Sequence, residues 1–251
     1  VQLDIDFDQN GTVDHSLNTT TDISGNYLFS GLLVADYDII VTQPAGTTQT
    51  DDPDATLDNR SSLTLAGGED NTSQDFGYRG DSALGDVVFW DVNNNGAFDA
   101  GVDRGVAGVD VALEIDFNGD LTADYTRTIQ SDASGNYAFA NLVPGDYTVS
   151  VAAGSIPGGL ASDPTVDGDG TVTPHTSDVT LGSNETNNDQ DFGYTGTGSL
   201  GDTIFWDANA NGTHDAGEPG LPGVTVSLDV DIDRNGSVDY TFTTTTDASG
   251  N

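Results

Sequence analysis

Short runs in which apolar and polar residues alternate are the clearest pattern along this chain. From Val109 to Ile115 every second residue is a large apolar one, and the segments 137–139 and 147–151 alternate in the same way around a Pro-Gly turn. A period of two places the apolar side chains on one face of a β-strand. Gly, Asn, Asp and Pro separate the runs, as is typical of tight turns. The pattern predicts an all-β fold in which short strands pack as a β-sandwich.

The same blocks of sequence return at the scale of a whole domain. The segment from Val1 to Asp14 reappears from Val226 to Asp239, and a middle copy runs from 111 to 124. Each copy leads through Thr-rich sequence to an Asp-x-Ser-Gly-Asn motif, at 22–26, 132–136 and 247–251. Two further blocks occur twice: Leu84–Asp91 with Leu200–Asp207, and Asp75–Tyr78 with Asp191–Tyr194. A repeat of this length is a domain rather than one turn of a solenoid.

Placed in order, the blocks predict three segments. Residues 81–194 are one complete sandwich repeat, 1–80 are the C-terminal part of a preceding repeat, and 195–251 are the N-terminal part of a further one. We therefore expect tandem domains joined end to end. Because the end of the chain matches its start, we expect the sequence to be a window cut from a longer array of such repeats. The alternative is that the two partial domains complete each other between molecules by strand addition.

Charge narrows the possible partners. The chain has 42 acidic residues against five basic ones, a formal net charge of −37. The charge argues against nucleic acid and anionic membranes as partners because both require basic patches, and no apolar run is long enough to span a bilayer. High charge also suits a disordered chain, but the regular alternation favours folded repeats. Repulsion among the carboxylates destabilises a compact state unless cations neutralise it.

The chain lacks cysteine and lysine, so two kinds of covalent cross-link are excluded. There is no cysteine, so disulfides are excluded, and no lysine, so a Lys–Asn isopeptide cross-link is excluded too. Bound metal is the remaining candidate for stabilising small domains.

The segment 207–218 has the spacing of a calcium loop. Oxygen-bearing side chains occupy its first, third, fifth, ninth and twelfth positions, and Gly212 occupies the sixth. In an EF-hand-type loop the seventh residue contributes its backbone carbonyl, and a glutamate at position twelve binds bidentately. An all-oxygen ligand set favours Ca²⁺ over zinc. The predicted ligands are Asp207, Asn209, Asn211, Thr213, Asp215 and Glu218.

The equivalent segment from 91 to 103 keeps most of this spacing. Its predicted ligands are Asp91, Asn93, Asn95, Ala97 through its carbonyl, and Asp99. Position twelve is Val102, and we expect Asp103, one residue later, to take its place. The alternative is an ordinary Asn-Gly turn, which does not require oxygens at fixed offsets in two copies.

A second class of loop lies in the repeated hairpin. The predicted ligands are Asp6, Asp8, Asn10 and Asp14 in the first copy, Asp116, Asn118, Asp120 and Asp124 in the middle copy, and Asp231, Asp233, Asn235 and Asp239 in the last. The alternative is a β-hairpin whose Asp residues face solvent. The glycine shifts to Gly119 in the middle copy while the oxygens keep their spacing, which favours metal. A further acidic group, Asp163, Asp167 and Asp169, is a weaker candidate for another site.

Several motifs together resemble a known family. The run Gly-Asp-x-x-Phe-Trp-Asp-x-Asn-x-Asn-Gly occurs at 85–96 and 201–212, and Asp-Ala-Gly-Glu-Pro-Gly-Leu-Pro-Gly-Val follows at 215–224. With Gly-Asn-Tyr-Ala-Phe at 135–139, Pro-Gly-Asp-Tyr at 144–147 and the closing Asp-Phe-Gly-Tyr, the chain resembles the SdrD B-like repeat of serine–aspartate repeat surface proteins, which is related to Cna B-type, prealbumin-like sandwiches.

The resemblance implies calcium-rigidified spacer domains that project a binding domain or build a surface fibre. The family's calcium loop falls on two sets of residues here: Asp91, Asn93, Asn95 and Asp99, and Asp207, Asn209, Asn211, Asp215 and Glu218. Val102 departs from the pattern, which puts the affinity of that copy in doubt, and the lack of lysine departs from the isopeptide-forming relatives.

Three classes of function are weighed on these observations. The first is an extracellular structural protein at the cell surface, in which Ca²⁺-rigidified repeats form a spacer, a stalk or a filament with neighbouring repeats or identical subunits. The alternative is an adhesin module that recognises host protein or glycan, although no cluster of exposed aromatic residues indicates a binding face. An enzyme is not expected, because neither His15 nor His214 recurs across the copies. Sequons at Asn18, Asn59 and Asn184 are possible glycan sites.

Overall fold

The computed structural model describes residues 1–117, 120, 122–231, 236–238 and 240–251, and the chain divides into two compact units, 1–196 and 197–251. Nearly all regular structure is β-strand, and the helical structure of the described residues is one 3-10 turn, Ala153–Ser155. The prediction of an all-β fold is confirmed. The domain boundaries at 80/81 and 194/195 stay a prediction.

The larger unit begins with a four-stranded antiparallel sheet in the order β2-β1-β3-β5. Its strands are β1 (Gln2–Asp6), β2 (His15–Asn18), β3 (Ala35–Ile40) and β5 (Arg60–Leu65), and a separate ribbon pairs β4 (Thr47–Asp51) with β6 (Gly77–Gly80). One face of the sheet is buried, through Leu3, Ile5, Tyr37 and Ile39. The opposite face carries acidic residues, because alternate side chains of a strand point to opposite sides.

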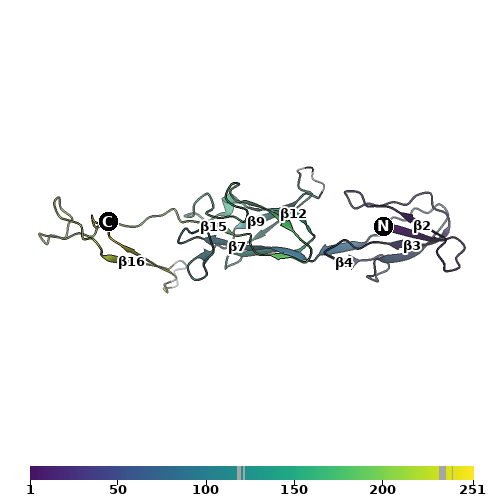
Figure 1. Cartoon of the computed structure of the whole chain (residues 1–251), viewed down its shortest axis with the longest axis horizontal. Coiled ribbons are helices and arrows are strands. Elements are labelled where there is room, and N and C mark those ends of the chain that lie inside the picture. The colour runs from purple at the N-terminus through teal and green to yellow at the C-terminus, as the bar shows by residue number, and fades with distance from the viewer. Residues whose placement is uncertain (118–119, 121, 232–235, 239) are drawn as a thin grey trace. The chain divides into compact units, whose positions relative to one another are not determined.

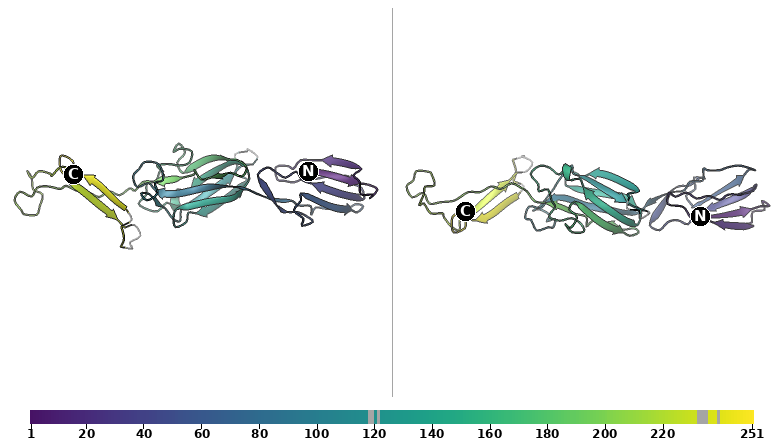
Figure 2. Two further views of the ribbon diagram at one scale, coloured as in Figure 1. Left: turned by 60° about the horizontal axis from the view of Figure 1, so that its bottom comes forward. Right: turned by 90° about the horizontal axis from the view of Figure 1, so that it is seen from above.

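A β-sandwich follows in the same unit. One sheet has the order β10-β9-β12-β13, and the other has the order β11-β7-β14 with β15 and β8 also paired to β7. The first sheet contains β9 (Asp110–Ile115), β10 (Tyr125–Gln130), β12 (Gly145–Val151) and β13 (Thr176–Leu181). The second contains β7 (Ser82–Trp90), β8 (Arg104–Gly105), β11 (Asn136–Leu142), β14 (Thr186–Asn187) and β15 (Phe192–Tyr194). Figures 1 and 2 show the two sheets as separate layers.

The core of the sandwich lies between these sheets. The alternating residues of β9 and β12 are buried against β7, β11 and β15, in one cluster that contains Leu113, Val149, Val88, Phe139 and Phe192. Burying a side chain of this kind stabilises a fold by about 1.5–3 kcal/mol. The apolar residues that alternate in the sequence are therefore the ones that the sandwich buries, as predicted.

In the sheets β2-β1-β3-β5 and β10-β9-β12-β13, a tyrosine on an inner strand is hydrogen-bonded to the chain that leads into that strand. Tyr147 donates its hydroxyl hydrogen to the carbonyl of Val143 at 2.7 Å, and Tyr37 does the same to Leu33 at 2.8 Å. In both bonds the acceptor lies four residues before the tyrosine. The first four-stranded sheet and the sandwich therefore share this local hydrogen bond as well as a sequence pattern.

The smaller unit contains one two-stranded antiparallel ribbon in its described residues. It pairs β16 (Thr225–Val230) with β17 (Tyr240–Thr245). A bridge between Phe205 and Gly220 closes the loop that precedes it.

Candidate metal centres

Pairing between β7 and β8 closes the loop from Asp91 to Asp103. Phe89 pairs with Gly105 and Trp90 with Arg104, so the two ends of the loop are held together. Within the loop, the carboxylate of Asp91 accepts the backbone N–H groups of Asn95 at 3.1 Å and Gly96 at 2.9 Å. These bonds curl the backbone around the carboxylate.

The other predicted side-chain ligands of this loop meet at one point. The amide nitrogens of Asn93 and Asn95 donate to the same oxygen of Asp99, at 3.0 and 2.6 Å. Ala97 donates its N–H to the Asn95 side chain at 2.9 Å, which fixes the turn at the residue expected to offer a carbonyl. The amide hydrogens give Asp99 the positive partial charge that a bound cation would supply. The loop therefore has the residue types of a hard-cation site, while its asparagine oxygens accept the backbone N–H groups of Asn95 and Ala97.

Asp103 takes the place that the glutamate occupies in the other copy. It accepts the N–H of Val92 at 2.9 Å and the N–H of Asp99 at 2.7 Å. Glu218 accepts the N–H groups of the equivalent residues, Ala208 at 2.9 Å and Asp215 at 3.0 Å. One extra residue and a shorter side chain thus bring a carboxylate to the same backbone donors.

The loop from 207 to 218 repeats the whole pattern in the smaller unit. Asn209 and Asn211 donate to one oxygen of Asp215 at 2.9 and 2.6 Å, and Gly212 donates to Asp207 at 2.8 Å. Thr213 donates its N–H to Asn211 at 2.8 Å. The side-chain hydrogen bonds from Asn209 and then Asn211 lower the pKa of Asp215, which favours its ionised form.

The first hairpin loop gathers three carboxylates. Ligand oxygens of Asp6, Asp8 and Asp14 all lie within 4.8 Å of one another. Asp6 accepts the N–H of Gly11 at 2.7 Å, and Asp14 accepts the N–H of Phe7 at 2.9 Å. Desolvation raises the pKa of Asp6, but the backbone donors, Gly11 first, outweigh it and the net pKa is lowered.

The predicted fourth residue of this loop lies in the same turn. Asn10 donates its side-chain amide to Asp8 at 2.9 Å, and its own oxygen accepts the N–H of Thr12 at 2.8 Å. The structure thus brings all four predicted residues of the first hairpin loop together.

The two other hairpin loops agree with the first in the part that the structure describes. Phe117 donates its N–H to Asp124 at 2.8 Å, and Asp120 donates its N–H to Asp116 at 3.3 Å. In the last copy Gly236 donates to Asp231 at 2.7 Å. The predicted ligands Asn118, Asp233, Asn235 and Asp239 lie outside the described residues. Ligation itself stays a prediction for every loop.

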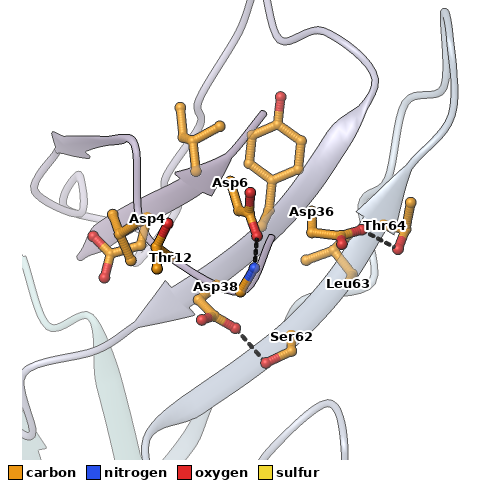
Figure 3. A pocket seen from close by; sticks show the side chains of 12 residues that line it. Asp4, Asp6, Thr12, Asp36, Asp38, Ser62, Leu63 and Thr64 are labelled. Carbon is orange, nitrogen blue, oxygen red and sulfur yellow. Dashed lines mark hydrogen bonds between the residues drawn. The ribbon is translucent and has the colours of Figure 1, made fainter. Parts of the chain in front are cut away.

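Two of the sheets, β2-β1-β3-β5 and β10-β9-β12-β13, carry pairs of carboxylates and hydroxyls on neighbouring strands that sequence reasoning missed. Figure 3 shows Asp36 hydrogen-bonded to Thr64, and Asp38 to Ser62, across β3 and β5. In the sandwich Thr180 donates to Asp146 at 2.6 Å and Thr148 to Asp178 at 2.7 Å, across β12 and β13. Asp38 lies on β3 and Ser62 on β5, whereas in the corresponding pair of the sandwich the hydroxyl of Thr148 lies on β12 and Asp178 lies on β13. Only the pairing register therefore reveals that these two pairs are equivalent.

A pair of carboxyl groups lies beside β7, the central strand of the second sheet, between the residues that pair with β14 and those that pair with β15. Desolvation, followed by repulsion from Asp86, raises the pKa of Asp191 to about 6. Desolvation also raises the pKa of Asp86, to which Asp191 is hydrogen-bonded. Both residues belong to repeated blocks of the sequence, but the spacing of 105 residues gave no sign that they meet.

Comparison with known proteins follows the repeat pattern. The model of the SdrD B-like domain matches residues 82–194 and 198–251. Serine-aspartate repeat-containing protein F of Staphylococcus epidermidis is 34% identical over 242 residues, which cover 92% of this chain and 13% of that protein. Serine-aspartate repeat-containing protein D of Staphylococcus aureus (strain MW2) is 32% identical over 253 residues, 96% of this chain and 18% of that protein. The chain therefore spans less than a fifth of either relative.

Solved structures show only distant likeness. The Bacillus anthracis TIE protein matches with a TM-score of 0.41 and 13% identity, over 99% of this chain and 38% of that one. GBS52, the minor pilin of Streptococcus agalactiae, matches with a TM-score of 0.32 and 12% identity, over 80% of this chain and 83% of that one.

The family match and the sequence relatives decide the broad class of the protein. In the described part of the chain, no helix has the length and apolar character needed to cross a membrane. The chain is an extracellular, cell-surface repeat sequence. It belongs to the SdrD B-like domain family.

Proposed function

We propose that this chain is a calcium-stiffened spacer, a non-catalytic run of β-sandwich repeats within a longer surface protein. The observation that carries the proposal is the convergence of two asparagine amides on one aspartate oxygen, which recurs at Asp99 and at Asp215. In both loops a closing carboxylate, Asp103 or Glu218, accepts the equivalent backbone N–H groups. A turn that served only to reverse the chain would not need this arrangement twice.

Electrostatics supports the proposal. A net charge of −37 opposes compaction, and each divalent ion removes repulsion where carboxylates are most crowded. Extracellular calcium modules bind with dissociation constants of about 10⁻⁴–10⁻³ M. Calcium at a hundredfold excess over that constant would stabilise the fold by about 2.7 kcal/mol per site. Two or three such sites would equal much of the stability of a typical domain, about 5–15 kcal/mol.

The 91–103 loop contacts the core of the sandwich, so a calcium ion bound in the loop would also restrict the motion of the domain. Asp91 and Asp103, at the two ends of the loop, are 1% and 4% exposed. Phe98, in the loop, packs edge-to-face on Phe89 of β7 with ring centroids 5.3 Å apart. Because Phe89 is fully buried in the sandwich, fixing the loop also fixes the end of β7.

The test compares the full chain with and without calcium. We expect Ca²⁺ to raise the melting temperature over that in EDTA, and we expect small-angle scattering to show a narrower distribution of dimensions. Asp99→Asn removes one predicted ligand charge and should reduce the calcium-dependent rise. Asp70→Asn makes the same charge change at an exposed loop residue and should leave it unchanged.

Two results would contradict the proposal. Equal melting and equal scattering in Ca²⁺ and EDTA would remove the role of calcium. A calcium response that Asp99→Asn and Asp70→Asn reduce by the same amount would mean that the ion acts as diffuse counter-charge rather than in the loops. Sedimentation velocity at rising protein concentration separates a spacer, which stays monomeric, from a filament subunit.

A further inference from the structure

Strand β6 runs directly into strand β7, with one residue between them. β6 pairs with β4 as far as Gly80, and β7 pairs with β11 from Ser82 onward, so the chain crosses from the first part to the sandwich at Asp81. Asp81 donates its N–H to the carbonyl of Gly46 at 3.0 Å, and its carboxylate accepts the hydroxyl of Thr48 at 2.8 Å. Every residue of the crossing is therefore hydrogen-bonded or paired.

The two parts touch closely at this crossing. At Gly80 an added Cβ would lie 1.8 Å from the carbonyl oxygen of Leu142, at the end of β11. At Gly46 it would lie 2.8 Å from the Pro144 ring and 2.8 Å from the Ser183 hydroxyl. Gly46 also has φ +68°, a left-handed conformation that favours glycine. The two glycines thus let the first part approach the β11–β12 and β13–β14 turns of the sandwich.

Polar contacts lie on both sides of the crossing. The guanidinium of Arg79 on β6 donates to the side-chain oxygen of Asn141 at 3.2 Å. Ser82, the first residue of β7, donates its hydroxyl to the carbonyl of Gly182 at 2.8 Å. The chain is therefore fixed to the same two turns of the sandwich before and after it crosses.

Half of this arrangement recurs at the end of the sandwich where β7 terminates. Leu160 forms an antiparallel bridge with Gly196 there, as β4 does with β6. Gly159 directly precedes that bridge and has φ +104°. The spacing Tyr-x-Gly-x-x-x-Leu-Gly occurs both at 78–85 and at 194–201. The pairing that ends in a close glycine therefore belongs to the repeat and not to one crossing alone.

We propose that these contacts form a rigid joint, which holds the first part of the chain against the sandwich whether or not calcium is bound. The joint consists of residues 46–48 and 79–82 on one side, and residues 141–144 and 183 on the other. Relative motion is the default for domains that an exposed linker connects. A rotation about Asp81 would instead break its hydrogen bond to Gly46 and press Gly80 into the backbone of β11.

The joint gives the sandwich a docking surface whose partner is a neighbouring repeat. The surface is formed by Pro144 and Ser183, and its occupant is the glycine turn at Gly46. The predicted calcium ligands all lie outside the joint. The inference therefore goes beyond the proposed function, because it assigns the stiffness between repeats to protein contacts and not to ions bound in the loops.

The test measures a distance between two spin labels on the full chain. Because the chain has no cysteine, Asn18→Cys on β2 and Ala138→Cys on β11 create unique label sites, both at exposed residues. Double electron–electron resonance should give one narrow distance distribution, equally narrow in Ca²⁺ and in EDTA. A distribution that is broad in EDTA and narrows only in Ca²⁺ overturns the joint, although it agrees with the proposed function.

A glycine substitution tests the close approach. Gly80→Ala should broaden or shift the distribution in both conditions, because the new methyl group meets the Leu142 carbonyl. Gly67→Ala is the control in the same part of the chain, since its Cβ would lie at an ordinary 3.5 Å from Val34. Equal distributions for the two variants would refute the steric basis of the joint.

An insertion tests the joint without a clash that could unfold the sandwich. Two glycines inserted between Asp81 and Ser82 supply a linker and should abolish the narrow peak, whereas two inserted between Gly67 and Gly68, in an exposed turn, should preserve it. A narrow peak that survives the first insertion overturns the proposal. Asp99→Asn should leave the peak unchanged while it reduces the calcium-dependent rise in melting temperature, so either proposal can fail while the other stands.

Discussion

Replacing Asp191 with asparagine should stabilise the sandwich at neutral pH and not in acid. In the native chain Asp191 lies beside Asp86, and its pKa rises from an ordinary 3.8 to about 6, first through desolvation and then through repulsion from Asp86. A raised pKa means that the folded state holds the proton more tightly than the unfolded state does. The contribution of this carboxyl to stability is therefore full below about pH 4, falls as the pH rises toward 6, and is unfavourable above 6.

The size of the effect follows from the same shift. A change from 3.8 to about 6 corresponds to at most about 3 kcal/mol, since one pH unit is worth 1.36 kcal/mol. Because the carboxyl is partly exposed, solvent screening reduces this to about 1–2 kcal/mol. Asparagine keeps an oxygen for the Val87 N–H, which lies 3.4 Å away, and its amide can donate to Asp86.

Urea unfolding between pH 4 and pH 8, in EDTA, measures the difference. Trp90 fluorescence in a Trp206→Phe background reports on the sandwich, because Trp90 ends β7. We expect Asp191→Asn to exceed the native chain by about 1–2 kcal/mol at pH 7.5, and the difference to shrink to a few tenths of a kcal/mol or less near pH 4. Asp163→Asn, an exposed acid of the same sandwich, should give a difference that does not change with pH. A variant that is less stable at pH 7.5, or equally shifted at both pH values, would refute the reasoning.

Two further predictions concern the scaffold and use the same unfolding assay. Gly135→Ala should destabilise the sandwich by about 2 kcal/mol or more, because Gly135 has φ +83° and an added Cβ would lie 2.4 Å from the Val88 carbonyl oxygen. Gly154→Ala, with open space around it, should change little, and equal losses in the two variants would contradict the steric argument. Tyr147→Phe should lose about 1 kcal/mol through the missing hydrogen bond to Val143. Tyr125→Phe, at a tyrosine that is 51% exposed, is its control, and the idea fails if the two match.

The repeated turn motif shows how far a short sequence determines its own structure. In all three Asp-x-Ser-Gly-Asn copies the aspartate accepts N–H groups two and four residues later: Asp22 at 2.9 and 2.8 Å, Asp132 at 2.8 and 2.9 Å, and Asp247 at 2.7 and 3.0 Å. Hydrogen bonds from the backbone, first that of Asn26 to Asp22 and that of Ser134 to Asp132, lower the pKa of these carboxyls. The motif is complete within five residues, so it needs no help from the rest of the fold.

The sequence by itself determined the features whose interactions are local. Period-two alternation specified the buried face of β9, and the spacing of oxygens brought Asn93, Asn95 and Asp99 together, because both depend only on the geometry of a few consecutive residues. Tertiary structure decided the features that join distant segments. Asp86 meets Asp191 only because β7 lies beside the chain that leads into β15, and Asp167 is buried only because its loop pairs with Gly193. The residues of each pair are far apart in the sequence, so no local pattern predicts that they meet. Strand order and loop packing, which bring them together, are set by the whole core.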